Sequence, residues 1–269
     1  MFNAVNVEAK GSHIYYSSRD LDNTTWSEAS RVHTFPDGSL SWFPALAVNS
    51  EGDELHVVWE RVSNVGRGVW YSHGSPSGSD VSWTTPRQLS TDNIPSLKPD
   101  IAVSSGGDIH VVWGEAGSEK NSYYVRYCRY DPGQKRCSES KRIDTDRVFI
   151  NQINPTEPSP RLALWETQSE VHLCVTWHGF RSGDAEDALV SCSDDGGGTW
   201  ERPRTMSAFP ATAQEGQDPS IRPSLVFDAS GTLHGVWQQR VDVSAQSYYE
   251  IYYARAKNCV FLPLVTRHG

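Results

Sequence analysis

The sequence predicts an all-β protein, and three observations carry that prediction. Its 269 residues include 10 Trp and 11 Tyr, together with 21 Gly and 15 Pro, but only 2 Met. Aromatic residues favour strands, whereas glycine and proline favour tight turns. Short runs in which apolar and polar residues alternate recur along the chain, which is typical of antiparallel strands with one buried face.

A repeat organises these runs. Four segments align with one another: FPALAVNSEGDELHVVW, KPDIAVSSGGDIHVVW, SPRLALWETQSEVHLCVTW and RPSLVFDASGTLHGVW. Each has an early proline (Pro44, Pro99, Pro160 and Pro223), an apolar run, a polar or glycine-containing turn, and a second run ending in tryptophan (Trp59, Trp113, Trp177 and Trp237). A polar loop and two further strand-like runs follow each tryptophan, so one repeat contains four short strands.

Four-stranded repeats of about 55 residues indicate a β-propeller, in which each blade buries both faces against its neighbours. The first 34 residues fit one more repeat that lacks its first strand. We therefore predict a single domain of five blades, at 1–40, 41–92, 93–150, 151–210 and 211–269, with ring closure near the termini. The run VFLPLV supplies either the fourth strand of the last blade or the missing first strand of the first. A six-bladed ring that has lost one blade is the alternative.

Charge and hydropathy exclude several classes of protein. The formal net charge is −9 and no basic run is present, which argues against a nucleic-acid-binding protein. No apolar stretch approaches the roughly 18 residues of a membrane-spanning helix. The first ten residues, MFNAVNVEAK, lack the basic start and apolar core of a secretory signal.

The chain has five cysteines: Cys128, Cys137, Cys174, Cys192 and Cys259. The first two flank the turn between the third and fourth strands of blade three. If Trp177 faces Leu189, antiparallel register places Cys174 opposite Cys192, near disulfide reach. We expect two local disulfides, an unpaired Cys259, and a secreted or cell-surface protein whose export signal is absent from this chain. Buried free thiols are the alternative.

The segment SCSDDGGGTW, residues 191–200, predicts a tight turn between the third and fourth strands of blade four. Its pattern, which consists of Ser193, Asp195, Gly196, Gly197, Thr199 and Trp200, resembles the Asp-box of sialidases and related BNR-repeat propellers. The resemblance implies that this turn is a fold element at the blade edge, remote from the catalytic face. A looser copy is formed by Ser18, Asp20 and Trp26, and Trp83 keeps the tryptophan position in blade two.

The same resemblance implies catalytic residues of the sialidase type: three arginines on a carboxylate, a Tyr–Glu nucleophile pair and an Asp acid/base. The stretch SIRPSLVF resembles the surroundings of the family's Arg-Ile-Pro motif, so Arg222 is a candidate, although no isoleucine separates it from Pro223. Arg161 is a second candidate, and YYEIYY offers Tyr248, Tyr249 and Glu250. Because Lys98 fills the position of Arg222 in its own repeat, Arg222 is alternatively a variable residue of the repeat.

A ligand-binding face needs only polar groups beside aromatic residues. Candidates at the start of the first strands and just after the repeat tryptophans are Lys98, Asp100, Arg161, Arg222, Glu60, Arg61, Glu115, His178, Gln239 and Arg240. We expect a monomer that binds a glycan or an extracellular protein on its central face, without a metal or organic cofactor. The alternative functions are an exo-sialidase-type glycoside hydrolase and a non-catalytic structural module of a longer surface protein. For the candidate residues themselves, the alternative is an ordinary solvated rim without a ligand.

Three histidines, His56, His110 and His234, each precede a repeat tryptophan by three residues. They belong to different blades, and packed sheets lie about 10 Å apart. They therefore cannot share one zinc ion at about 2 Å, and we expect them to have structural roles.

Overall fold

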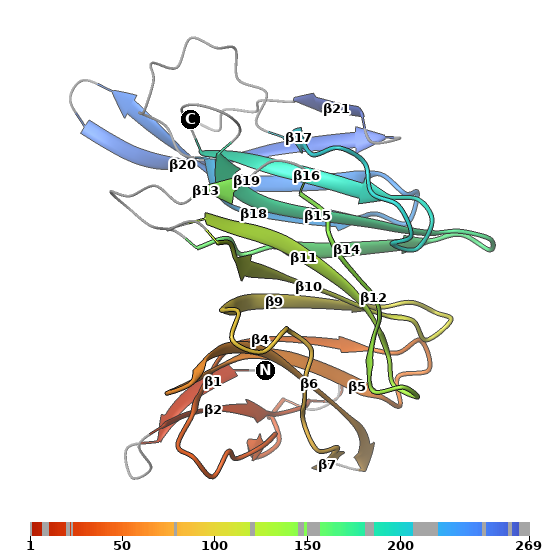
Figure 1. The fold of residues 1–269 in the computed structure, drawn as a ribbon. Coiled ribbons are helices and arrows are strands. Elements are labelled where there is room, and N and C mark those ends of the chain that lie inside the picture. Colours follow the sequence, from red (N-terminus) through yellow and green to blue (C-terminus); the bar gives the residue numbers. More distant parts are fainter. Residues whose placement is uncertain are drawn as a thin grey trace. The chain divides into compact units, whose positions relative to one another are not determined.

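The computed structural model describes residues 2–6, 11–19, 22, 24–77, 80–118, 122–144, 148–149, 157–180, 186–206, 220–243, 246–257 and 260–263. Within these residues all regular structure is β, arranged in five antiparallel sheets whose neighbouring strands are mostly consecutive in the chain (Figure 1). The prediction of an all-β protein built from antiparallel sheets is confirmed for this part of the chain. No helix of the described residues is long and apolar enough to cross a membrane.

The strands follow the predicted repeats. The first sheet contains β1 (Phe2–Asn6), β2 (Gly11–Tyr16) and β3 (Ser30–Arg31). The second contains β4 (Leu40–Val48), β5 (Leu55–Ser63), β6 (Gly66–Ser77) and β7 (Asp80–Trp83), with β8 (Arg87–Gln88) also paired to β6. The third contains β9 (Ser96–Val103), β10 (Ile109–Ala116), β11 (Ser122–Asp131) and β12 (Arg136–Arg142), with β13 (Val148–Phe149) also paired to β11.

The last two sheets have four strands each. The fourth contains β14 (Arg161–Glu166), β15 (Val171–Phe180), β16 (Glu186–Ser193) and β17 (Arg204–Thr205). The fifth contains β18 (Ser220–Phe227), β19 (Leu233–Val243), β20 (Gln246–Lys257) and β21 (Val260–Pro263). Because β21 pairs with β20, the run VFLPLV supplies the fourth strand of the last sheet. The number of blades in a closed ring stays a prediction.

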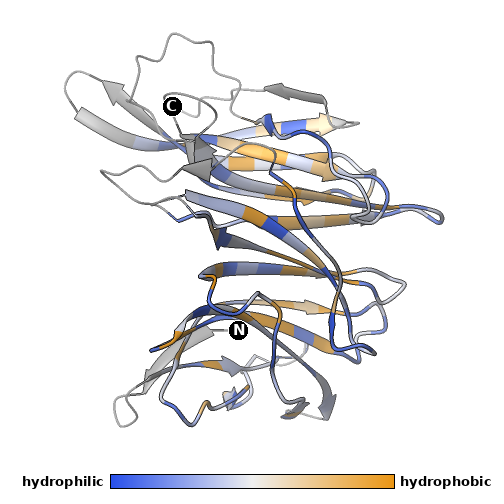
Figure 2. Ribbon diagram, in the orientation of Figure 1, coloured by the Kyte–Doolittle hydropathy of each residue, from blue (hydrophilic) through white to orange (hydrophobic). Residues whose placement is uncertain are grey.

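The chain divides into two compact units. Unit 1 comprises residues 1–115 and 128–140, and unit 2 comprises 116–127 and 141–269. Figure 2 shows apolar residues along the strands of both units. In unit 1 the repeat tryptophans Trp59 and Trp113 are each 1% exposed, and in unit 2 Trp177 and Trp237 are 0% and 3% exposed. The repeat tryptophans are therefore core residues.

Both predicted disulfides are present. Cys128 and Cys137 are bonded with a Cα–Cα distance of 5.5 Å, and Cys174 is bonded to Cys192. Cys174 and Cys192 face each other in the register of β15 and β16, as do Trp177 and Leu189. The register deduced from the sequence is thus confirmed, whereas Cys259 lies outside the described residues.

The first strand of three repeats contains one residue with an unusual backbone conformation. Phe43, Lys98 and Arg222, each directly before the repeat's proline, have φ angles of 50°, 48° and 52°. Beside Phe43 and Arg222 the pairing with the second strand also shifts register. A left-handed conformation is uncommon for a non-glycine residue, and such strained positions often lie near functional sites.

Candidate functional site

Residues 193–200 form a turn held by the carboxylate of Asp195. Its Oδ1 accepts hydrogen bonds from the backbone N–H of Thr199 at 2.7 Å and the hydroxyl of Ser193 at 2.8 Å. Its Oδ2 accepts one from the Thr199 hydroxyl at 2.7 Å. These bonds, led by the one from the Thr199 backbone, lower the pKa of Asp195 below its usual range. The residues of the Asp-box-like pattern thus bind one another.

A tyrosine from another strand of unit 2 also anchors this turn. The Tyr127 hydroxyl donates to the carbonyl oxygen of Gly196 at 3.1 Å, and the Tyr127 ring packs edge-on against Trp200. A Cβ atom on Gly197 would lie 2.0 Å from that hydroxyl, so only glycine fits there. The turn joins β16 to β17, whereas Arg161 begins β14 at the opposite end of the same sheet. The contacts support a structural role for the turn.

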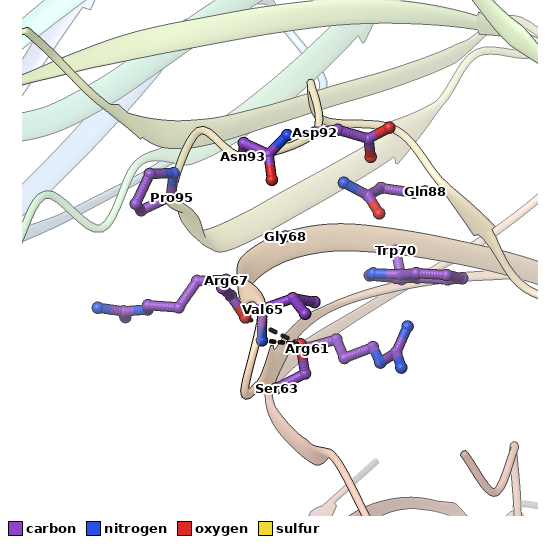
Figure 3. A pocket seen from close by; sticks show the side chains of 11 residues that line it. Arg61, Ser63, Val65, Arg67, Gly68, Trp70, Gln88, Asp92, Asn93 and Pro95 are labelled. Carbon is purple, nitrogen blue, oxygen red and sulfur yellow. Dashed lines mark hydrogen bonds between the residues drawn. The ribbon is translucent and has the colours of Figure 1, made fainter. Parts of the chain in front are cut away.

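A groove of about 360 Å³ lies in unit 1, at the lower end of the usual range for small-ligand sites. It is formed by the turn between β5 and β6 and by the segment that leads into β9 (Figure 3). Its lining residues are Arg61, Ser63, Val65, Gly66, Arg67, Gly68, Trp70, Gln88, Asp92, Asn93 and Pro95. We call this site the β5–β6 groove.

Arg61 supports one wall of the β5–β6 groove. Its guanidinium forms an ion pair with Asp37, and its Nε donates to the Ser39 hydroxyl at 3.0 Å. The guanidinium carbon also lies 4.0 Å from the ring centre of Phe35 and 4.8 Å from that of Trp70. Hydrogen bonding from Ser39, together with the charge of Arg61, lowers the pKa of Asp37. Arg61 is therefore fixed on one side of the Trp70 ring.

Glu60 contacts the groove residue Arg67 and is 0% exposed. One carboxylate oxygen accepts from Arg67 Nε at 2.7 Å, and the other accepts from the backbone N–H of Lys98 at 3.1 Å. The Lys98 ammonium in turn lies 5.5 Å from the ring centre of Phe43. Glu60 thus orients a groove arginine and also satisfies the backbone of the strained residue at the start of β9. A fully buried carboxylate of this kind reaches a ligand only through its neighbours.

Trp70, Gln88, Asp92 and Asn93 give the groove its chemistry. Trp70 and Gln88 face each other across β6 and β8. Figure 3 shows the Trp70 ring with Arg61 below it and with Gln88, Asp92 and Asn93 above it. The turn that carries Asp92 includes Asn93 with a φ of 62°, a conformation that asparagine tolerates. An aromatic surface thus faces two amides and one carboxylate.

The predicted site residues are only partly brought together. Glu60, Arg61 and Lys98 lie at or beside the β5–β6 groove, whereas Glu115 is 3% exposed in β10 and Asp100 lies further along β9. Sequence reasoning missed Arg67, Trp70, Gln88, Asp92 and Asn93. No pattern in the sequence singles them out: Arg67 and Trp70 lie in β6, Gln88 lies in β8, and Asp92 and Asn93 lie in the turn before β9.

In unit 2, Arg161 and Arg222 are exposed, whereas His178 and Gln239 are 3% and 8% exposed. Arg161 follows the proline of its repeat and Arg222 precedes it, so the two arginines are not at equivalent positions. The side chains of Arg240 and Tyr248 lie outside the described residues.

The structure contains a Tyr–Glu pair in the predicted segment. The Tyr252 hydroxyl donates to Glu250 Oε2 at 3.2 Å, while Tyr249 is 48% exposed. The hydroxyl bonded to Glu250 thus comes from a tyrosine that the sequence analysis did not single out. Tyr252 also stacks on Trp237, a core residue, with ring centres 6.0 Å apart.

The repeat histidines His56 and His234 bind tyrosines on neighbouring strands. His56 Nδ1 lies 2.9 Å from the Tyr71 hydroxyl, and His234 Nδ1 lies 2.6 Å from that of Tyr253. Burial lowers the pKa of His110 to about 4, which keeps it neutral in the core. These contacts agree with structural roles. Among the described residues no group of three His, Cys, Asp or Glu side chains has the geometry of a metal site.

No family model matches the chain, and no curated protein matches it. Among solved structures, the intramolecular trans-sialidase from Ruminococcus gnavus, in complex with oseltamivir carboxylate, is 11% identical with a TM-score of 0.55, over 91% of this chain and 50% of that chain. The GH93 α-L-arabinofuranosidase of Fusarium graminearum, in complex with arabinobiose, is 11% identical with a TM-score of 0.55, over 84% and 67%.

The endo-arabinase from Bacteroides thetaiotaomicron is 11% identical with a TM-score of 0.50, over 100% of this chain and 94% of that chain. The chain spans only 41% of a GH43_12 protein retrieved from a capybara gut metagenome. Likeness at such low identity concerns the fold alone. The chain therefore shares the fold of glycoside hydrolase β-propellers.

Proposed function

We propose that this chain is a secreted β-propeller protein that binds a glycan in the β5–β6 groove. The observation that carries the proposal is the Trp70 ring beside Gln88, Asp92 and Asn93. An aromatic ring packs well against the apolar C–H face of a sugar, and amide and carboxylate groups form directional hydrogen bonds with hydroxyl groups. A protein partner inserting one polar side chain is the other ligand that this arrangement suits.

The structures that share the fold support a carbohydrate ligand. Their names describe a trans-sialidase, an arabinofuranosidase with arabinobiose, and an endo-arabinase. The two disulfides support secretion, because such bonds persist in oxidising compartments.

The groove favours binding over hydrolysis. Most glycosidases place two carboxyl groups on either side of the scissile bond, about 5–10 Å apart. Among the described residues that line the groove, Asp92 is the only one with a carboxylate. The nearby Glu60 is fully buried in contacts with Arg67 and Lys98.

A glycoside hydrolase of the sialidase type is the second candidate function. The observation that favours it is the hydrogen-bonded Tyr252–Glu250 pair in unit 2, in the segment where a Tyr–Glu nucleophile was expected. Arg161 and Arg222 would then bind an anionic group, Tyr249 would be the alternative nucleophile, and the groove in unit 1 would have no part in catalysis. A purely structural module is the third candidate.

Parallel assays on the whole chain separate these candidates. In a glycan-array screen, the wild type should bind, and Trp70→Ala should lower the signal at least about tenfold, as loss of an aromatic anchor does. The matched control is Trp26→Ala, because Trp26 is a 64% exposed tryptophan of the same unit. Asp92→Ala, in an exposed turn, tests the groove without removing a packed ring.

Fluorogenic sialosides and arabinofuranosides provide the test for catalysis. Turnover that disappears in Arg222→Ala would establish the hydrolase. A Trp70→Ala variant that binds like the wild type would exclude the groove as the binding site. Silence in both assays would favour the structural module.

A further inference from the structure

We infer that the β5–β6 groove selects uncharged sugars and rejects sugars that carry carboxylate or sulfate groups. The inference rests on the proposed function and assigns its ligand class. Its basis is the pairing of every groove arginine with a carboxylate of the protein.

Arg61 has little capacity left for an anionic ligand. Its guanidinium is paired with Asp37, bonded to Ser39 and covered by the rings of Phe35 and Trp70. Only 18% of its side chain is exposed. A site that recognises an anion usually offers an arginine fork open to the ligand. Here the guanidinium instead supports the aromatic ring from the side opposite Gln88 (Figure 3).

Arg67 is paired in the same way. Its Nε binds Glu60 at 2.7 Å, and 25% of its side chain is exposed while that of Glu60 is fully buried. A buried partner of this kind cannot move away to release the arginine. The positive charge of Arg67 is therefore largely balanced before any ligand arrives.

The cations at the groove do not outweigh its carboxylates. Three cations, of Arg61, Arg67 and Lys98, stand against three carboxylates, of Asp37, Glu60 and Asp92. Asp92 lies in the exposed turn on the side of Trp70 where a sugar would bind. A ligand carboxylate there meets a like charge, whereas a sugar hydroxyl can donate a hydrogen bond to Asp92.

A glycan array that contains neutral, carboxylated and sulfated members tests the inference. We expect the bound glycans to be uncharged, and their affinity to change less than about twofold between 0.02 and 0.5 M salt, because screening acts only on charged ligands. Bound glycans that are mostly anionic would overturn the inference and leave the proposed function standing. No bound glycan at all would refute the proposed function itself.

The Asp37→Asn variant supplies a second test, in which binding of carboxylated glycans is expected to increase. Releasing Arg61 from its carboxylate should raise binding of carboxylated glycans at least about tenfold relative to the wild type, since the freed guanidinium can form charge-assisted hydrogen bonds with a ligand carboxylate. The control is Asp53→Asn, an exposed aspartate of the same unit that bonds Asn49 away from the groove. If Asp37→Asn unfolds, Asp92→Asn removes the exposed carboxylate and should shift preference in the same direction. An unchanged preference in folded Asp37→Asn or Asp92→Asn would overturn the inference.

Discussion

Replacing Asp195 by alanine should destabilise unit 2 without touching the proposed ligand site. The substitution removes three hydrogen bonds and leaves the Thr199 N–H and the Ser193 and Thr199 hydroxyls to find other partners. Loss of hydrogen bonds to a charged acceptor costs about 1–3 kcal/mol. Because Asp195 is exposed, water replaces part of the loss, so we expect a value of about 1–2 kcal/mol.

Urea unfolding, monitored by tryptophan fluorescence, measures this change. We expect a lower urea concentration at the midpoint and an unchanged dependence of the free energy of unfolding on urea concentration. The matched control is Asp194→Ala, which removes the neighbouring carboxylate and only a surface contact with His172. That contact should contribute less than about 1 kcal/mol. Glycan binding should be unchanged in both variants wherever the fold persists.

The pKa of Asp195 adds a pH test. Because the pKa is depressed in the folded state, the stabilisation by Asp195 is present above the unfolded value near 4 and is lost as pH falls through the folded pKa. Asp195→Asn should therefore differ most from the wild type at neutral pH and least in acid. A selective loss of glycan binding in Asp195→Ala at an unchanged midpoint would refute the structural reading of the turn.

The other predictions concern the core, the disulfides and pH. Glu60→Ala should lower the free energy of unfolding by about 3 kcal/mol, because it strips a buried partner from Arg67 and the Lys98 N–H; an unchanged urea midpoint would contradict this. Thiol counting on the denatured, unreduced protein should find one free thiol, that of Cys259, whereas five would refute both disulfides. Burial raises the pKa of Asp144 to about 6, so this group should lower stability by roughly 2–3 kcal/mol as pH rises from about 4 to above 6. Asp144→Asn should flatten that decline, which urea titrations at several pH values would detect.

The parts of the fold that the sequence predicted share one property, a repeated apolar pattern. The repeat tryptophans mark the second strands, and the register deduced from Trp177 and Leu189 placed Cys174 opposite Cys192. Burial enforces such patterns, because a slip of one residue would turn every apolar side chain of a strand to the other face. The turn at Asp195 was equally predictable, since its hydrogen bonds are local in the chain.

The candidate site was only partly predictable because its residues lie outside the aligned segments. Trp70 lies in β6, Gln88 in the short strand β8 and Asp92 in the turn before β9, so the repeated apolar pattern does not single them out. Burial also gives one of the predicted site residues a different role. Glu60 was expected to meet a ligand, but its carboxylate is enclosed with Arg67 and the Lys98 N–H.

At Phe43, Lys98 and Arg222 the repeat fixes the backbone conformation while the side chain varies. The backbone is held in the same strained conformation at all three positions, and each is followed by proline. Because an aromatic and two cationic side chains occupy these positions, the conformation comes from the repeat and not from any one side chain. Backbone strain of about 1–3 kcal/mol at such a position persists only where the surrounding structure enforces the conformation. At Lys98 the buried Glu60 stabilises this conformation by accepting a hydrogen bond from the backbone N–H. That same carboxylate orients Arg67 in the groove, so the contact that stabilises the start of β9 also sets the charge that a ligand meets.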